Sequence, residues 1–208
     1  MIGVDENDTV REENMIYEER KSIRKYKPEM IPEDVLRQIL EAGCAAPSAK
    51  NRQPWKFLVA VGDKKEEICA LMEKGIAKQK KSRMMPEKFK KGLASAENTL
   101  RIMREAPVLV LVMNTHSGDP YKPVMFGKRV SEIHDSLSIG AAVENMCLQA
   151  AELGIGSLWI GNTVYAHKEI TAYLQTKDQL SCAVIFGYPD EKPAGRPRRK
   201  FEDTVEFL

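Results

Sequence analysis

Short runs of branched apolar residues alternate along this chain with longer stretches of helical periodicity. Val and Ile dominate runs enclosed by polar or turn-forming residues, a pattern typical of β-strands, at residues 57–61, 108–112 and 183–186. Apolar residues recur with the helical period over residues 32–45, 66–76, 94–104 and 131–153. This alternation of strands with helices restricts the fold class to α/β or α+β.

The length of the chain, 208 residues, suits one domain. A chain of this length buries roughly 70% of its unfolded surface, so its core needs neither a metal ion nor a disulfide. The segment 1–13 carries five carboxylates and almost no apolar side chain after Val4. We therefore expect a flexible acidic N-terminal tail over residues 1–13 and a single domain over residues 14–208.

The composition argues against several classes of protein. Hydrophobic residues make up 43% and charged residues 30%, as in globular proteins, and the net charge is only +2. The longest apolar run, residues 106–113, is too short to span a membrane, and the acidic start does not resemble a signal peptide. The four cysteines lie far apart within apolar stretches, which favours buried free thiols in a cytoplasmic protein without a membrane partner.

The helical pattern over residues 131–153 is unusually rich in small side chains. It combines larger apolar residues with Gly140, Ala141, Ala142, Ala150 and Ala151. Small side chains let another backbone approach closely. We expect a central, buried helix with a close packing partner.

Most sequence signatures of catalysis are missing. The three histidines are scattered and no two cysteines are close in sequence, so no metal site is predicted. Neither a Gly-x-Ser-x-Gly elbow nor a phosphate-binding Gly-Lys-Ser or Gly-Lys-Thr segment occurs. The segment GIGSLWIG contains Gly154 and Gly156, but Trp159 stands where a dinucleotide fingerprint has its third glycine.

Basic residues gather between Lys74 and Lys91, where eight cations accompany a single acid, Glu87. The only aromatic residue there is Phe89, whereas single-strand nucleic-acid sites interleave several aromatics with their cations. We therefore expect no nucleic-acid partner. The stretch is either a lid that attracts an anionic ligand or a solvated surface helix.

Two segments near the N-terminus suggest a ligand site. RKSIR, residues 20–24, concentrates three cations and a hydroxyl, which suits a terminal phosphate, although an exposed basic helix face has the same composition. The second segment is APSAKNRQPW, residues 46–55. Its two prolines flank a turn that carries Ser48, Asn51 and Gln53. By itself the second segment indicates only a loop between a helix and a strand.

Taken in order, RKSIR, APSAKNRQPW, GIGSLWIG and the tail FGYPDEKPAGRPRRKFED resemble the FMN-dependent nitroreductase family. The resemblance extends over residues 15–207. It implies an α+β fold, an α/β/α sandwich with a central, mostly antiparallel sheet, in a domain-intertwined homodimer. It also implies two FMN sites, each built from both subunits.

The resemblance further implies how FMN is held. Its phosphate would be bound by Arg20, Lys21 and Ser22, with Arg198, and Arg196 as a helper, closing from the tail. Relatives commonly have a proline where this chain has Lys200 before Phe201, which leaves the register of the tail arginines open.

The flavin ring would be contacted by other residues. Arg24 would reach its pyrimidine edge, where a cation stabilises the negative charge of the reduced flavin. The chain would pass beside the ring at Trp159, Ile160 and Gly161, and a backbone N–H of this segment would lie near flavin N5. From the other subunit would come Pro47, Ser48 and Asn51.

The implied activity is that of an oxidoreductase. It would take hydride from NAD(P)H by a ping-pong mechanism and reduce nitroaromatic, quinone or similar flat acceptors. No catalytic acid or base side chain is expected, because the cofactor supplies the reactivity. The alternatives are a reductive dehalogenase or flavin-degrading relative on the same fold, and a flavin-binding storage or sensor protein without turnover.

Overall fold

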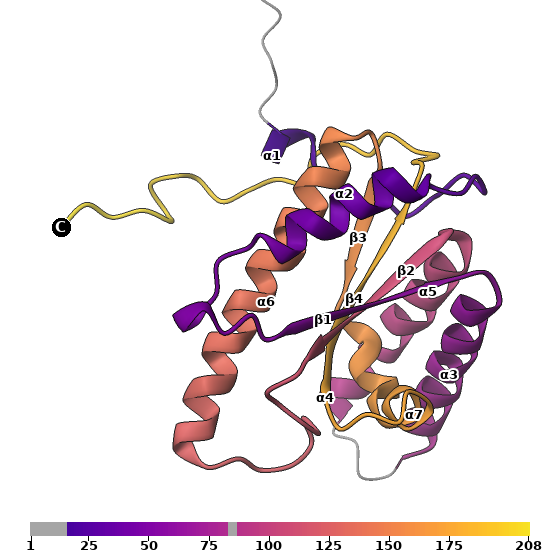
Figure 1. Ribbon diagram of the computed structural model, residues 1–208, viewed down its shortest axis with the longest axis vertical. Coiled ribbons are helices and arrows are strands. Elements are labelled where there is room, and N and C mark those ends of the chain that lie inside the picture. Colours follow the sequence, from indigo (N-terminus) through magenta and orange to yellow (C-terminus); the bar gives the residue numbers. More distant parts are fainter. Residues whose placement is uncertain (1–15, 83–86) are drawn as a thin grey trace, which may run out of the picture.

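The computed structural model describes residues 16–82 and 87–208 (Figure 1). The acidic tail predicted over residues 1–13 lies outside the described residues. The elements follow in the order α1 (Ile16–Glu19), α2 (Glu33–Cys44), η1 (Ala49–Asn51), β1 (Trp55–Val61), α3 (Gly62–Lys81), α4 (Glu87–Lys90), α5 (Leu93–Glu105), β2 (Val108–Asn114), α6 (Phe126–Glu152), β3 (Gly156–Ile160), η2 (Asn162–Ala166), α7 (His167–Tyr173) and β4 (Gln179–Gly187). No helix among these is long and apolar enough to cross a bilayer.

The strands form one four-stranded sheet in the order β1-β2-β4-β3. Every neighbouring pair is antiparallel, with Val110 of β2 opposite Val59 on one side and Val184 on the other. The predicted α+β class with an antiparallel sheet is confirmed. β1 and β3 are the two edges of this sheet.

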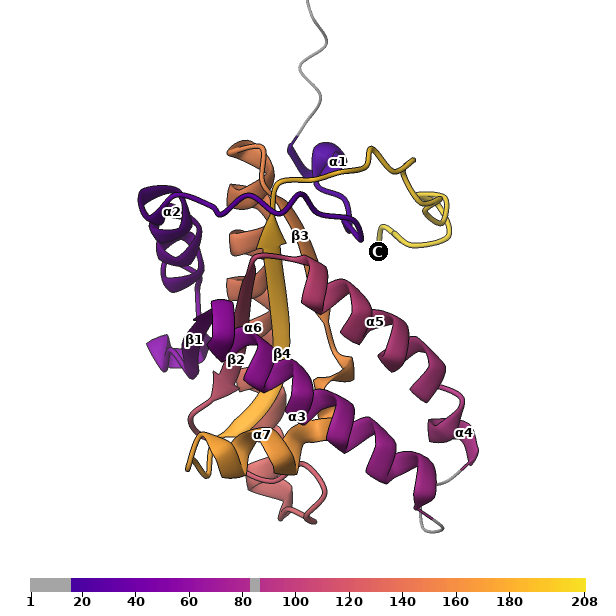
Figure 2. The same cartoon turned by 90° about the vertical axis from the view of Figure 1, so that its right-hand side faces the viewer.

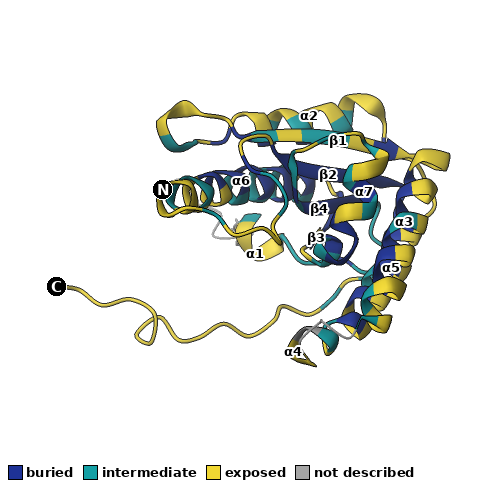
Figure 3. Cartoon of the chain, turned by 90° about the horizontal axis from the view of Figure 1, so that it is seen from below, coloured by how far each residue is buried: buried dark blue, intermediate teal, exposed yellow. Residues whose placement is uncertain are grey.

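Central strand β2 is buried over its whole length because both faces of the sheet are covered. Val108, Val110 and Val112 join a core beneath α2 and α6. Leu109, Leu111 and Met113 point to the other face, where α3, α5 and α7 cover a second core. Figure 2 shows these two helical layers on either side of the sheet, and Figure 3 shows the buried sheet between them.

Helix α6 finds its close packing partner within the same chain. A Cβ added at Gly43 of α2 would come within 2.7 Å of Met146 Cγ and 3.4 Å of the Ala142 carbonyl oxygen. Asn145 Nδ2 also donates to the Ala42 carbonyl, at 3.2 Å. The close approach of the two helices thus depends on Gly43 and reaches the backbone of Ala142, so this part of α6 has its packing partner within the same chain.

A glycine ends α6 and turns the chain into β3. Gly154 has φ +71°, the left-handed conformation that glycine adopts without strain. The Ile155 N–H then donates to the Ala150 carbonyl at 2.8 Å and the Gly154 N–H to Ala151 at 3.0 Å, a Schellman motif. The glycines of GIGSLWIG therefore have a structural role.

The first part of the basic stretch belongs to the end of α3. There Lys78 Nζ pairs with Glu169 at 3.0 Å and Lys80 pairs with Glu97. These contacts favour the surface helix over the lid for residues 74–81. Arg83 and the two methionines that follow it lie outside the described residues.

The expectation for the cysteines is correct for three of them. Cys69, Cys147 and Cys182 are buried free thiols, whereas Cys44 at the end of α2 is exposed. Burial raises the pKa of Cys69 and Cys147 to about 11 and that of Cys182 to about 12. Cys44 is exposed although the residue before it, Gly43, is buried against Met146 of α6.

We predict opposite effects for two helical glycines. A Cβ at Gly75 of α3 would lie 2.5 Å from Ala166 Cα, whereas one at Gly127 of α6 meets nothing within 4 Å. Gly75→Ala should lower the free energy of unfolding by about 1–3 kcal/mol, as overpacking does. Gly127→Ala should raise it by up to about 1 kcal/mol, because Ala favours the helix. Urea denaturation measures both, and equal midpoints would contradict the close packing of α3 on η2.

Candidate functional site

Backbone pairing ties the N-terminal segment to the end of the sheet. The Ile23 N–H donates to the Ser157 carbonyl of β3 at 3.0 Å, and Lys27 N–H donates to Tyr188 at 2.9 Å. The Asp190 N–H in turn donates to the Lys25 carbonyl at 3.0 Å. The residues before Ile23 and the residues after Asp190 are therefore held side by side.

The Tyr26 side chain adds a hydrogen bond to the backbone of the N-terminal segment. Its hydroxyl donates to the Ile23 carbonyl at 2.9 Å, and burial raises the pKa of Tyr26 well above its usual value. The hydroxyl therefore stays protonated and keeps donating, which fixes the turn that follows the RKSIR segment.

Between these two segments lies a surface pocket of about 740 Å³, which we name the basic pocket. Its walls contain five cations and one carboxylate, that of Glu18. Six of the residues predicted to hold FMN line it together: Arg20, Lys21, Ser22, Arg24, Arg196 and Arg198. Residues of the RKSIR segment and of the tail, far apart in sequence, thus share one pocket.

Two of these arginines have partners that position them, Arg20 outside the pocket and Arg24 at Ser22 within its wall. Arg20 Nε pairs with Glu144 Oε1 of α6 at 3.1 Å, a contact that sequence reasoning missed because nothing marks Glu144 in a helix with other polar residues. Arg24 donates from Nη1 to the Ser22 carbonyl at 3.1 Å, and its backbone N–H donates to Glu191. The excess positive charge of the pocket and its Ser22 hydroxyl suit an anion with several oxygen acceptors.

The residues predicted to pass beside the flavin ring lie at the end of edge strand β3. Trp159 is the one exposed residue of this strand, with 45% of its surface accessible, whereas Ile160 is 2% exposed and belongs to the core. Ile160 can therefore offer only its backbone to a ligand. A Cβ at Gly140 of α6 would lie 3.6 Å from Trp159 Cη2, an ordinary van der Waals distance, so α6 passes beside the indole.

The loop that carries Pro47, Ser48 and Asn51 lies elsewhere. It precedes β1, at the sheet edge opposite β3, and none of its residues is among those that line the basic pocket in the described part of the chain. One chain therefore does not bring this loop and the basic pocket into a single cavity.

The backbone of this loop is strained. Lys50, Asn51 and Gln53 have φ of 55°, 53° and 44°, a region that residues other than glycine rarely adopt. The loop is closed by the Gln53 N–H, which donates to Ser48 Oγ at 3.0 Å, and by Gln53 Nε2, which donates to Asn51 Oδ1 at 3.0 Å. Sequence reasoning missed this strain because the segment contains no glycine.

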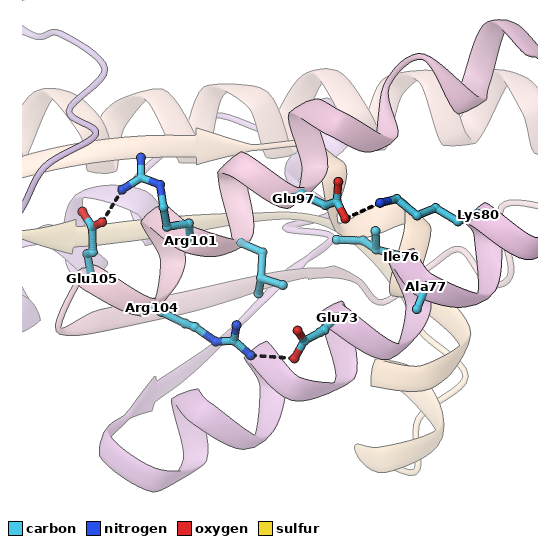
Figure 4. Close-up of a pocket in the computed structure, with 9 residues that line it drawn as sticks. Glu73, Ile76, Ala77, Lys80, Glu97, Arg101, Arg104 and Glu105 are labelled. Carbon is cyan, nitrogen blue, oxygen red and sulfur yellow. Dashed lines mark hydrogen bonds and ion pairs between the residues drawn. The ribbon is translucent and has the colours of Figure 1, made fainter.

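A second groove, of about 590 Å³, separates α3 from α5 (Figure 4). Its charged side chains pair with one another: Arg104 with Glu73 at 2.8 Å, Lys80 with Glu97, and Arg101 with Glu105. Because these charges are neutralised within the groove, the basic pocket is the better candidate for an anionic ligand.

Comparison with known proteins agrees with the predicted resemblance. The model of the Nitroreductase family matches residues 17–188, and the chain belongs to this family. It is 29% identical over 197 residues to the iodotyrosine deiodinase of Thermotoga neapolitana, which covers 89% of this chain and 95% of the relative.

Two solved structures share the fold. A nitroreductase with bound FMN from Bacteroides fragilis is 25% identical, with a TM-score of 0.65, over 94% of this chain and 99% of that one. The FMN-dependent nitroreductase NfnB from Mycobacterium smegmatis, in complex with NADPH, has a TM-score of 0.72 at 17% identity, over 93% and 96% of the two chains. The family prediction is confirmed, and the chain is an oxidoreductase of the nitroreductase family.

Proposed function

We propose that this chain is an FMN-dependent oxidoreductase that takes hydride from NAD(P)H and reduces nitroaromatic, quinone or similar flat acceptors. The observation that carries the proposal is the basic pocket, where five cations and the Ser22 hydroxyl converge. Family membership and the FMN in the related Bacteroides fragilis structure support the choice of anion.

The donor set of the basic pocket fits the phosphate of FMN. A phosphate dianion needs several N–H and O–H donors and a local excess of positive charge, and guanidinium groups match its oxygens well. Arg20, Lys21 and Ser22 provide these donors from one wall, and Arg196 and Arg198 face them from the tail.

The remaining residues would position the ring. Bound FMN supplies hydride-transfer chemistry between NAD(P)H and the acceptor. Arg24 would stabilise negative charge at the pyrimidine edge, and the exposed backbone at Gly161 would donate a hydrogen bond to the ring. Trp159 would cover one side of the ring with its half-exposed indole.

We further propose a homodimer in which the loop before β1 completes the partner's site. Large apolar side chains are exposed on the first half of α6, including Ile133 and Leu137, the latter 69% exposed. The tail leaves the body of the chain with Phe201 and Phe207 exposed, the latter at 86% (Figure 1). Apolar surface of this kind marks an interface with another chain.

The first prediction from this proposal concerns FMN retention. Arg20→Ala and Ser22→Ala should each raise the dissociation constant of FMN roughly tenfold or more, because charge-assisted hydrogen bonds are worth roughly 1.5–3 kcal/mol. Flavin fluorescence during titration measures the constant. Arg37→Ala, at an exposed residue of α2, is the control and should bind FMN as the wild type does. An unchanged constant in Arg20→Ala would remove the phosphate assignment.

Turnover distinguishes the proposed enzyme from a storage or sensor protein. The purified holoprotein should oxidise NADH or NADPH when a nitroaromatic compound or quinone is added under anaerobic conditions, with the parallel double-reciprocal lines of a ping-pong mechanism. A halogenated tyrosine belongs in the same screen because of the similarity to iodotyrosine deiodinase. Bound FMN without oxidation of either nicotinamide would favour storage or sensing.

The assembly is tested by light scattering. The wild type should have the mass of a dimer, because dimerisation would bury the exposed apolar side chains of α6 and the tail. Leu137→Glu should favour the monomer and weaken FMN binding, while leaving the fold intact because this side chain is exposed within one chain. A monomeric wild type that binds FMN tightly would overturn the two-subunit site.

A further inference from the structure

The strained loop, residues 48–53, is fixed to helix α6 by side chains. Arg52 Nη2 donates to Asp135 Oδ2 at 3.1 Å, and the same nitrogen lies 3.1 Å from His116 Nδ1. One turn further along α6, Ser138 Oγ accepts from the Ala49 N–H at 3.2 Å. The loop is therefore tied to α6 at both of its ends.

These ties explain how the unusual backbone persists. Left-handed conformations at Lys50, Asn51 and Gln53 are unfavourable and survive only where the surroundings leave the chain no alternative. Residues held in this way are concentrated at ligand sites. The side chains of Asn51 and Gln53 are exposed and hydrogen-bond to each other, whereas Ala49 and Arg52 bind α6.

Burying the Asp135 carboxylate costs free energy, so stability alone does not account for its place beneath the loop. Its side chain is 1% exposed, and Oδ1 has no hydrogen-bond partner among residues 16–82 and 87–208. Burial of a carboxylate is unfavourable unless its oxygens are well paired, and an apolar side chain of similar volume is often as stable or more so. What Asp135 supplies is a fixed anchor for one surface arginine.

We propose that Asp135, acting through Arg52, is a positioning residue that holds the strained loop in the conformation that presents Ser48 and Asn51 to the flavin of the partner subunit. The flavin part of this proposal rests on the proposed function. The part that concerns loop order does not, because it follows from the contacts within one chain.

Asp135 is buried and Arg52 is partly exposed, so substitutions at the two residues should affect stability differently. This difference distinguishes a positioning role from a merely structural one. The Arg52 side chain is 34% exposed, so it can turn to water once Asp135 loses its charge. Asp135→Asn should therefore leave the free energy of unfolding nearly unchanged while the loop becomes mobile. Arg52→Gln should lower stability more, because it leaves a buried carboxylate without its cation.

The experiment compares Asp135→Asn, Arg52→Gln and the double variant with the wild type. Hydrogen exchange, followed by mass spectrometry of the loop, reports the Ala49 and Gln53 amides. Urea denaturation reports stability, and fluorescence titration reports FMN affinity. Glu132→Gln is the matched control, because it removes a 2.9 Å ion pair with Arg129 from the same helix without touching the loop.

In Asp135→Asn we expect loop exchange to be about tenfold faster and the FMN dissociation constant about tenfold higher, as for the loss of one charge-assisted hydrogen bond. The double variant should match Asp135→Asn in both measurements, because the two residues act as one unit. Glu132→Gln should match the wild type.

The outcomes separate the two proposals. Unchanged loop exchange in Asp135→Asn, or faster exchange with unchanged FMN affinity, would overturn the positioning role while leaving the proposed function intact. A uniform loss of urea stability and exchange protection throughout Asp135→Asn would make the residue merely structural. Failure of the wild type to bind FMN would overturn the proposed function and the flavin part of this inference, and loop exchange would still test the anchor.

Discussion

The outer edge of strand β3 is the contact on which the candidate site depends. Its partner there is the segment that begins at Ser22, which forms a parallel bridge with Ser157. The segment can approach because Gly156 has no side chain: a Cβ there would lie 2.9 Å from Ile23 Cγ1. Since the following residues pair with the chain after β4, this edge brings the RKSIR segment and the arginine-rich tail to one pocket.

Helix α6 connects that pocket to the strained loop. Glu144 fixes Arg20, Gly140 in the middle of the helix lies beside the Trp159 indole, and Asp135 anchors Arg52. Nine residues of helix separate Asp135 from Glu144, a span of about 14 Å at the usual helical rise. One rigid element thus sets the positions of groups that come from three distant parts of the sequence.

The sequence predicts the elements whose faces are buried by the chain itself. The stripes of α2 and α6 and the branched residues of β2 carry strong periodicity, because each packs on a core. β3 is harder to predict because it is only five residues long and begins at Gly156, a residue type that is depleted in strands. The carboxylate of Asp135 could have been noticed, because it falls on the same stripe as Ser138, Ile139 and Ala142.

The parts that resist prediction from one sequence share a physical cause. The tail from residue 191 has no helix or strand and is largely exposed, and the strained loop leaves the side chains of Asn51 and Gln53 exposed although Ala49 and Arg52 bind α6. In the proposed homodimer the tail and the exposed side of the loop meet the other subunit, and these contacts are absent from a single chain. The contact between Asp135 and Arg52 fits this arrangement. It holds the loop in one conformation before FMN binds to the partner subunit, and ordering the loop only on binding would reduce the affinity for FMN.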